Sequence, residues 1–383
     1  MARRPHLVFL LGLLLLSCFT PARWTGADSY NNGNRCIAEE RAALLEFKEG
    51  IQVDTCGLLT SWGDERDKRD CCKWNGIVCS NRTGHVIMLD LRGVDASPIT
   101  EACLLGNISS SLQELKHLSY LDLSNNNFRW KPMPSFIGSL TKLRYLNLSN
   151  AGFMGEIPHH LGNLTSLIYL DLGAQCISCR HEQILHAENL SWLSRLTFLR
   201  YLDLSYADLS KASAQWFHII IRLSFLTDLG MGWCSLSPTI PSSLLYINST
   251  RSLRTLHLNG NHFGFSVFQW LFNLSRINTH LVDVDLSYNQ LEGPIPDLFS
   301  NLKHLAFLDL SWNNLQGRLP EKLRDLCSLQ VLSLGGNNLT EQFNSIVQTL
   351  SGCKHMERQA LDLSSNALWG RYLTVVYLVG FLC

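Results

Sequence analysis

The sequence predicts an α/β solenoid: a right-handed, horseshoe-like arc of stacked coils, with a parallel β-sheet on its concave face and a helical, disulfide-bonded cap at the N-terminus. Three observations predict this fold class. A short leucine motif recurs along most of the chain, an amphipathic segment precedes its first copies, and cysteines cluster around that segment. A coil that cannot bury its own apolar side chains must stack on its neighbours, so a repeat of this kind predicts a solenoid.

The repeat is clearest in the segment LSYLDLSNNNF, which begins at Leu118. Further copies begin at Leu143, Leu167, Leu199, Leu226, Leu253, Leu281, Leu305 and Leu329, with partial copies at Leu89 and Leu361. Matched positions such as Leu121, Leu146 and Leu170 lie 24 or 25 residues apart. The chain therefore carries leucine-rich repeats of the 24-residue kind over residues 85–370, about ten of them, the last incomplete.

Each repeat contains a short strand in which leucines face the core and the residues between them face the concave surface. An asparagine after the strand is expected to turn inward and satisfy backbone groups of adjacent coils. This position holds Asn126, Asn261, Asn289, Asn313, Asn337 and Asn366. The middle repeats have other residues there, which predicts a less regular middle: Ala151, Gln175, Ala207 and Cys234.

A glycine and a proline follow the strand in several repeats, as GEIP at Gly155, GPIP at Gly293 and GRLP at Gly317. Glycine permits a turn that other residues resist, and proline fixes the direction of the chain after it. This pattern predicts a second extended segment in each of these coils.

Residues 36–80 predict the cap that covers the first apolar layer. In the segment CIAEERAALLEFKEGI, Leu44, Phe47 and Ile51 fall on one face of a helix. Trp62 and Trp74 are expected to fill the space beneath this helix.

At these residues the chain resembles the N-terminal domain of plant extracellular leucine-rich-repeat proteins, whose pattern is Cys, ERxALLxFK, SW and CCxWxGVxC. The matching residues are Glu40, Arg41, Ala43, Leu44, Leu45, Phe47, Lys48, Ser61, Trp62, Cys71, Cys72, Trp74, Gly76 and Cys79. With ISSSLQELKHLSYLDLSNNNF, the chain is most similar to receptor-like proteins of the ethylene-inducing xylanase receptor group, from about Cys36 to Leu368.

The resemblance implies disulfide bonds between Cys36 and Cys71 and between Cys72 and Cys79. It does not assign the pairing of the other cysteines of the repeats and cap: Cys56, Cys103, Cys176, Cys179, Cys234, Cys327 and Cys353.

Residues 1–27 predict a secretory signal peptide, because Arg3 and Arg4 precede a short apolar run and small residues follow it. Secretion favours disulfide bonds among the 13 cysteines. Eight sequons predict N-glycosylation. They begin at Asn81, Asn107, Asn147, Asn163, Asn189, Asn248, Asn273 and Asn338.

The sequence predicts neither an enzyme nor a cofactor-binding or nucleic-acid-binding protein. It has no nucleophile elbow, phosphate-binding loop, kinase signature or HExxH motif, and its formal net charge is zero. Cys176 and Cys179 with His181 and His186 resemble a zinc site, but a disulfide suits a secreted loop better. Aspartates recur once per coil within Leu-Asp-Leu, and we expect a solvated structural row there. These are Asp122, Asp171, Asp203, Asp285, Asp309 and Asp362.

Two aromatic sets are expected on the concave face. One equivalent strand position holds Tyr120, Tyr145, Tyr169 and Tyr201, and a position farther along holds Tyr206, Trp233, Tyr288 and Trp312. Exposed Tyr and Trp suit recognition of a protein, peptide or glycan. The alternative is that neighbouring rings stack only to stabilise the sheet.

Residues 371–383 depart from the repeat as a hydrophobic tail too short to span a bilayer. The resemblance implies a plasma-membrane receptor whose extracellular part recognises a ligand in defence and signals through partner receptor kinases. The alternative is a soluble apoplastic binding protein, an inhibitor of a microbial wall-degrading enzyme, or a truncated decoy.

Overall fold

The described residues form a leucine-rich-repeat solenoid with an N-terminal cap. The computed structural model describes residues 36–94, 102–129, 131–174, 184–237, 252–277, 280–353 and 360–369, and the backbone of 378–379. All of them belong to the compact unit Arg35–Cys383. The expected signal peptide, the sequon at Asn248, the pair Cys176 and Cys179, and the tail apart from 378–379 lie outside the described residues.

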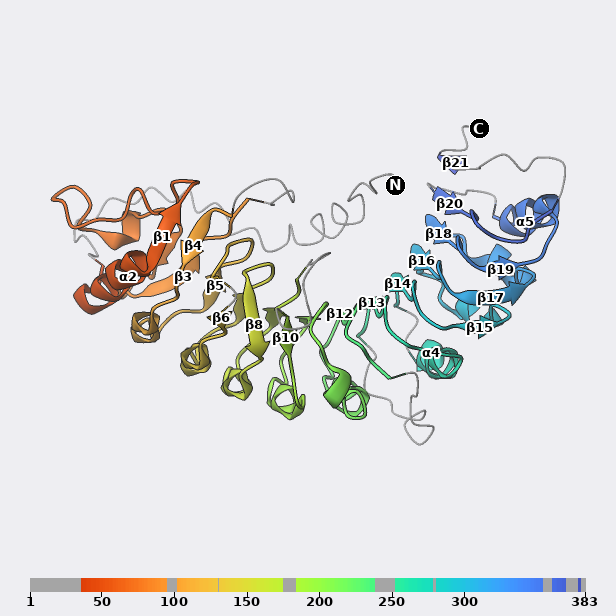
Figure 1. The fold of residues 1–383 in the computed structure, drawn as a ribbon, viewed down its shortest axis with the longest axis horizontal. Coiled ribbons are helices and arrows are strands. Elements are labelled where there is room, and N and C mark those ends of the chain that lie inside the picture. The colour runs from red at the N-terminus through yellow and green to blue at the C-terminus, as the bar shows by residue number, and fades with distance from the viewer. Residues whose placement is uncertain are drawn as a thin grey trace. The chain divides into compact units, whose positions relative to one another are not determined.

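One sheet runs the length of this unit and, among the described residues, contains 13 strands in chain order. The strands lie side by side, with helices on the opposite side of the coils (Figure 1). They are β2 (Ile77–Cys79), β3 (Val86–Asp90), β5 (Tyr120–Asp122), β7 (Tyr145–Asn147), β9 (Tyr169–Asp171), β11 (Tyr201–Asp203), β12 (Asp228–Gly230), β13 (Thr255–His257), β14 (Asp283–Asp285), β16 (Phe307–Asp309), β18 (Val331–Ser333), β20 (Ala360–Asp362) and β21 (Leu378–Val379). Pairing is parallel from β3 to β20 and antiparallel at the two ends.

Equivalent residues of successive repeats pair directly in this sheet, as Tyr145 does with Tyr169 and Leu146 with Leu170. The register continues without a gap through β9, β11, β12 and β13. The expected irregular middle is therefore wrong for the sheet. Ala151 and Ala207, which replace the inward asparagine, are small and buried, and the strands of their repeats pair normally.

Second extended segments form after several strands, as the glycine and proline pattern predicted. They make two further sheets, β10-β8-β6 and β15-β17-β19. Their members are β6 (Lys131–Pro132), β8 (Phe153–Glu156), β10 (Leu185–His186), β15 (Glu292–Gly293), β17 (Asn314–Gly317) and β19 (Asn338–Leu339). Gly155, Gly293 and Gly317 have φ of 83°, 80° and 83°, a backbone region in which glycine pays no steric penalty.

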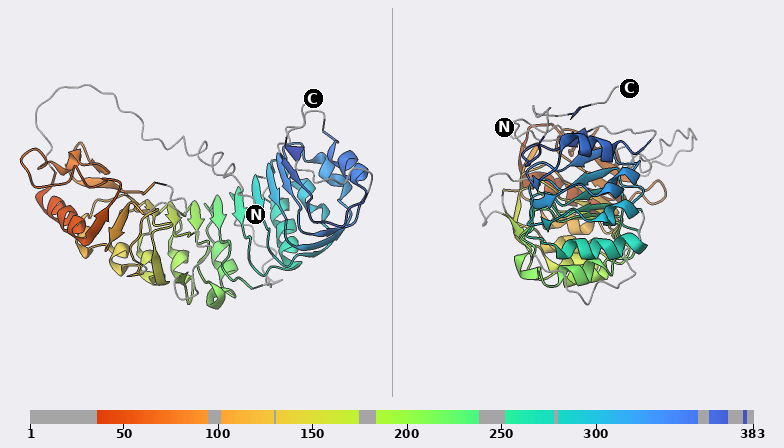
Figure 2. Two further views of the ribbon diagram at one scale, coloured as in Figure 1. Left: turned by 45° about the horizontal axis from the view of Figure 1, so that its top comes forward. Right: turned by 90° about the vertical axis from the view of Figure 1, so that its right-hand side faces the viewer.

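Helical turns complete the coils on the side away from the long sheet (Figure 2). The α-helices of the repeats are α3 (Trp216–Ile220), α4 (Ser266–Ile277) and α5 (Phe343–Leu350). Most other coils use 3-10 turns: η3 (Ser110–Glu114), η4 (Ser135–Ser139), η5 (His159–Asn163), η7 (Ser191–Arg195), η8 (Ser210–Ala212), η10 (Asp297–Asn301) and η11 (Glu321–Asp325).

The cap contains α2 (Ala38–Gly50), the turn η2 (Cys71–Lys73) and β1 (Ile51–Asp54), which pairs antiparallel with β4 (Leu104–Gly106) from farther along the chain. Leu44 and Phe47 of the helix are fully buried, whereas Ile51, expected on the same helical face, begins β1. Trp62 and Trp74 stack beneath the helix with ring centroids 5.2 Å apart. Their indole nitrogens donate to the carbonyls of Asn75 and Lys68 at 2.9 and 2.8 Å.

The inward asparagines bridge adjacent coils, as predicted. Asn126 donates through Nδ2 to the carbonyls of Leu91 and Leu123, and its Oδ1 accepts from the Leu104 amide. Asn313 repeats this arrangement with Leu286, Leu310 and Leu291. Each such side chain satisfies backbone groups that a buried turn would otherwise leave unpaired.

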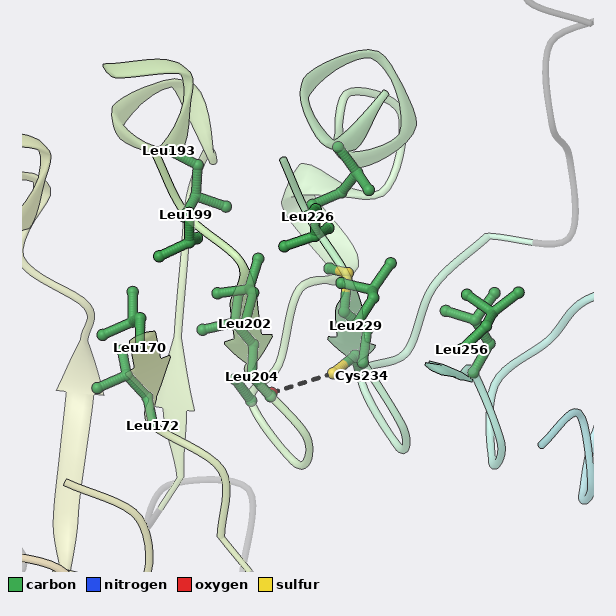
Figure 3. Packing of buried hydrophobic residues seen from close by; sticks show 14 of the residues in the cluster. Leu170, Leu172, Leu193, Leu199, Leu202, Leu204, Leu226, Leu229, Cys234 and Leu256 are labelled. Carbon is green, nitrogen blue, oxygen red and sulfur yellow. Dashed lines mark hydrogen bonds between the residues drawn. The ribbon is translucent and has the colours of Figure 1, made fainter. Parts of the chain in front are cut away.

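Cys234 takes the place of this asparagine in the middle of the solenoid. Its Sγ is completely buried and donates to the Leu204 carbonyl of the preceding coil at 3.2 Å (Figure 3). Burial raises the pKa of the thiol well above its usual range, which keeps it protonated as a donor. Among the described cysteines, Cys234 has no disulfide partner, contrary to the general expectation for a secreted chain.

Candidate functional site: two aromatic rows on the long sheet

Tyr120, Tyr145, Tyr169 and Tyr201 form a continuous stack across β5, β7, β9 and β11, which we call the tyrosine column. Successive ring centroids lie 4.1, 4.3 and 4.2 Å apart, with interplanar angles of 6°, 13° and 9°. All four side chains are half-buried. Each interior ring has both faces covered by its neighbours, so the column offers a ligand mainly ring edges.

The hydroxyl groups of the column bond to the row of aspartates beside it. Tyr145 donates to Asp122 at 3.2 Å, and Tyr169 donates to Asp171 at 3.3 Å. Burial, and after it the negative charge of Asp122, raises the pKa of Tyr145 to about 12. Burial likewise raises the pKa of Tyr169 and of Tyr201 well above their ordinary value. These contacts favour a structural role for the column in the sheet, and ligand binding by its four tyrosines stays a prediction.

The expectation of a solvated aspartate row is wrong for several of its members. Asp122, Asp171 and Asp309 are buried. In each of the six repeats, the carboxylate accepts a hydrogen bond from the backbone amide two residues later, for example Ser124 to Asp122 at 3.0 Å and Ser311 to Asp309 at 2.9 Å. The aspartate therefore recurs because it shapes the turn after each strand.

Tyr206, Trp233, Tyr288 and Trp312 form the second row, which we call the aromatic ladder. Ring centroids lie 6.1 Å apart between Tyr206 and Trp233, 5.6 Å between Trp233 and Tyr288, and 5.6 Å between Tyr288 and Trp312. Trp233, Tyr288 and Trp312 are 42%, 41% and 50% exposed. The ladder is thus more open to solvent than the tyrosine column.

All four ladder residues lie in the turn after their strand and adopt left-handed backbone conformations. Their φ values are 68° for Tyr206, 58° for Trp233, 54° for Tyr288 and 56° for Trp312. Glycine and asparagine favour this region, whereas bulky side chains are rare there and raise the energy of the backbone. In two other repeats the equivalent position holds asparagine, which tolerates this conformation: Asn125 and Asn150 have φ of 56° and 52°.

In two coils the ladder position holds a glycine, and the tryptophan of the preceding coil packs over it. A Cβ on Gly260 would lie 2.2 Å from the indole of Trp233, and one on Gly336 would lie 2.8 Å from the indole of Trp312. The two glycines therefore make room for the large rings. The same backbone position can thus hold glycine without strain, yet four coils hold a large aromatic residue there.

Between the two rows lies a cluster of charged groups around His257. Its Nε2 is 3.1 Å from Asp283 Oδ1. Burial opposes protonation of His257, but the carboxylates of Asp283, Asp285 and Asp203 outweigh it and raise its pKa to about 9. Burial also raises the pKa of Asp285, which the nearby histidine opposes.

Four disulfide bonds join described cysteines. Two are the pairs that the resemblance implies, Cys36–Cys71 and Cys72–Cys79, and two link cysteines left unassigned, Cys56–Cys103 and Cys327–Cys353. The sulfur atoms of Cys36, Cys71 and Cys72 lie close together. Because all three are in disulfide bonds, they have no thiolate to offer a metal.

The sequons differ in accessibility. Asn81, Asn189 and Asn338 are exposed, whereas the other described sequon asparagines are half-buried: Asn107, Asn147, Asn163 and Asn273. Asn147 lies within β7, and its Nδ2 is 3.4 Å from the Tyr145 hydroxyl.

Known proteins share both the sequence and the fold. The leucine rich repeat N-terminal domain family matches residues 37–80, and leucine rich repeat families match 117–140, 142–164, 252–274 and 279–339. Receptor-like protein EIX1 of Solanum lycopersicum is 43% identical over 79% of this chain and 28% of its own length. Receptor-like protein EIX2 of the same species is 40% identical over 71% of this chain and 25% of its own.

Solved structures of plant receptor kinases are similar as well. The ectodomain of the Arabidopsis receptor kinase HAESA, in complex with an extended IDA peptide hormone, has a TM-score of 0.65 and 25% identity, over 86% of this chain and 49% of its own. That of GASSHO1/SCHENGEN3 from Arabidopsis thaliana, in complex with CASPARIAN STRIP INTEGRITY FACTOR 2, has a TM-score of 0.63 and 28% identity, over 85% of this chain and 35% of its own.

The fold and these matches define a leucine-rich-repeat protein of the plant ectodomain type. Within that class, the chain belongs with the plant receptor-like proteins of the EIX group, the family that its cap motifs indicated. It spans less than a third of the length of these two relatives. The relatives are receptor-like proteins and not members of enzyme families. No helix among the described residues has the length and apolar character needed to cross a membrane.

Proposed function

We propose that the chain is the extracellular recognition module of a plant cell-surface receptor-like protein, which binds a microbial or endogenous protein, peptide or glycan in defence signalling through partner kinases. The ligand contacts the aromatic ladder. The observation that carries this proposal is the exposure of Trp233, Tyr288 and Trp312 at left-handed backbone positions. Strain of this kind persists where a side chain serves something other than stability.

The residue types of the ladder and a related complex support a role in ligand recognition. Exposed Tyr and Trp supply large contact areas with a polar edge, and such residues dominate binding energy at interfaces. A related HAESA structure contains both the peptide hormone IDA and the co-receptor SERK1. That solved complex supports the assignment of a ligand and a partner kinase to the full-length relative of this chain.

Binding of an ethylene-inducing xylanase to the secreted chain tests the proposal, since the resembled receptor group is named for that protein. The variants Trp233→Ala and Trp312→Ala are expected to raise the Kd at least about tenfold each, as hot-spot aromatics do, with unchanged Tm. Biolayer interferometry and thermal denaturation measure the two effects. Phe272→Ala in α4 is the matched control, because this aromatic is also exposed, at 46%, but lies on the helical side.

Equal weakening in all three variants, or parallel losses of Tm in the two ladder variants, would contradict a binding role for the ladder. Failure of the unaltered chain to bind the xylanase would exclude that ligand for this chain.

The proposal includes N-glycans at the exposed Asn81, Asn189 and Asn338. Intact-mass measurement of the secreted chain before and after glycosidase treatment is expected to show one glycan fewer in the Asn338→Gln variant. An unchanged glycan mass would show that Asn338 is not modified.

A further inference from the structure

A second surface lies along the edge where the strands of the long sheet begin, away from the aromatic ladder at the other end of the strands. The residue three places before each strand lies on this edge, and in five consecutive coils it is exposed except at Ser252, which is half-buried. In these coils the position holds Phe198, Phe225, Ser252, His280 and His304. We call these residues the edge row.

The edge row consists of two ring pairs separated by one small residue. The rings of Phe198 and Phe225 lie 6.3 Å apart at an interplanar angle of 18°, and those of His280 and His304 lie 6.0 Å apart at 19°. Ser252 stands between the pairs, and its hydroxyl donates to the Ser224 carbonyl at 3.1 Å. The row is therefore interrupted by a slot at Ser252.

Beside this slot, on its histidine side, lies a groove of about 510 Å³, which is lined by Ser252, Arg254, His280, Val282 and His304. Neighbouring strands lie about 4.8 Å apart, so Phe225 and His280, two strands apart, are separated by about 10 Å. A ring in van der Waals contact on both faces needs about 7–8 Å. The slot is thus wide enough for one flat or chair-shaped ring between two aromatic faces.

Arg254 gives the groove its charge. Its side chain is exposed, and no described carboxylate lies within ion-pair distance of it. A guanidinium group binds carboxylates through two parallel hydrogen bonds, which fixes both position and orientation. The imidazoles of His280 and His304, on the next two coils, line the same groove. The groove therefore selects a ring that carries a carboxylate.

We propose that this groove binds an acidic oligosaccharide, with a hexuronate ring in the slot at Ser252 and its carboxylate on Arg254. An open groove along a sheet edge suits a linear oligomer, whereas a small molecule is usually enclosed by its pocket. Phe198 and Phe225 extend the surface by two coils and contact the next sugar rings through their apolar faces. The site is separate from the ladder and does not depend on the function proposed for it.

Titration of the secreted chain with an α-1,4-linked galacturonate hexamer, at fixed ionic strength, tests this site. The hexamer is expected to bind, and its fully methyl-esterified form to bind at least tenfold more weakly. Arg254→Gln is expected to weaken binding at least tenfold. Ser252→Trp is expected to abolish binding by filling the slot, with Tm checked for every variant.

Arg144→Gln is the matched control, because Arg144 is also exposed and directly precedes its strand, whereas the edge position of its own coil holds Lys142 in place of a serine. It is expected to change the Kd by less than twofold. Equal weakening by Arg144→Gln would show diffuse attraction of a polyanion and overturn the proposal. So would the absence of hexamer binding, or equal affinity for hexaglutamate with the same dependence on Arg254.

Trp233→Ala separates this site from the ladder. Hexamer binding is expected to remain unchanged in that variant even where xylanase binding is lost. Loss of hexamer binding in Trp233→Ala would place the acidic ligand on the ladder and overturn the groove assignment.

Discussion

The tyrosine column and the aromatic ladder occupy the same sheet but differ in almost every physical respect. Column rings lie 4.1–4.3 Å apart and are half-buried, and their hydroxyls bond to aspartates. Ladder rings lie 5.6–6.1 Å apart on left-handed backbone, and three of the four are exposed. The first arrangement stabilises the coils, whereas the second exposes side chains at a cost to backbone energy. Aromatic residues in one solenoid can therefore serve two different purposes.

Removal of an interior ring from the column should show the largest difference in stability between the column and the ladder. Tyr169→Ala removes contacts with Tyr145 and Tyr201 and is expected to lower the free energy of unfolding by about 3 kcal/mol. Trp312→Ala is expected to change it by less than about 0.5 kcal/mol. Urea denaturation of the two variants measures the difference. Similar losses in both would show that the ladder also holds the coils together.

The asparagine bridges provide a reference for the structural contribution of a single buried polar group. Asn126→Leu leaves buried backbone groups of two coils unpaired and is expected to cost about 2 kcal/mol. Asn366, whose side chain is only partly buried, should lose less in the same substitution. Thermal denaturation of both variants compares them, and a larger loss at Asn366 would contradict this explanation.

Alkaline pH should affect the column through Tyr145. The folded state holds its pKa at about 12, above the ordinary value of about 10, so the unfolded chain releases the proton first. Stability is therefore unaffected below about pH 10 and falls between about pH 10 and 12, by on the order of 1 kcal/mol at pH 11. Urea denaturation at a series of pH values should show a smaller fall for Tyr145→Phe, and an identical fall would assign the effect elsewhere.

The smallest expected effect concerns backbone strain in the ladder. Tyr288→Asn places at φ 54° a residue that tolerates this conformation. The free energy of unfolding is expected to stay the same or rise by about 0.5 kcal/mol, while ligand binding falls. Urea denaturation checks this, with Tyr169→Asn as the control that should destabilise. A clear loss of stability in Tyr288→Asn would contradict the assignment of strain.

The parts of the fold that follow from periodicity were predictable from the sequence. Leu121 and Asn126 recur in every regular coil, and each needs only its own repeat to define its place. The bonds Cys56–Cys103 and Cys327–Cys353 were not predictable, because stacking of the coils brings these residues together. Aspartate burial was predicted wrongly because alternation in a strand indicates which face a side chain is on, and not whether neighbouring coils cover it.

The site was predictable only in outline. The two aromatic sets were recognised from equivalent positions, but the sequence does not distinguish a stacked ring from an exposed one. Glycine at the ladder position of two coils, Gly260 and Gly336, and asparagine at Asn125 and Asn150 signal that this position has a positive φ. The groove at Arg254 was missed altogether, because its residues share no motif and come together only across adjacent strands.

The position of Asn147 has a consequence for biosynthesis. In the folded sheet its Nδ2 faces Asp122 and the Tyr145 hydroxyl, and its Oδ1 accepts from Ser149 at 2.7 Å. An oligosaccharide transferred to Nδ2 of Asn147 on the nascent chain would prevent β7 from pairing in the sheet and Tyr145 from stacking in the tyrosine column. Glycosylation of Asn147 and folding of this coil therefore compete. The glycan occupancy at Asn147 would measure the fraction of chains in which glycosylation occurs before the coil folds.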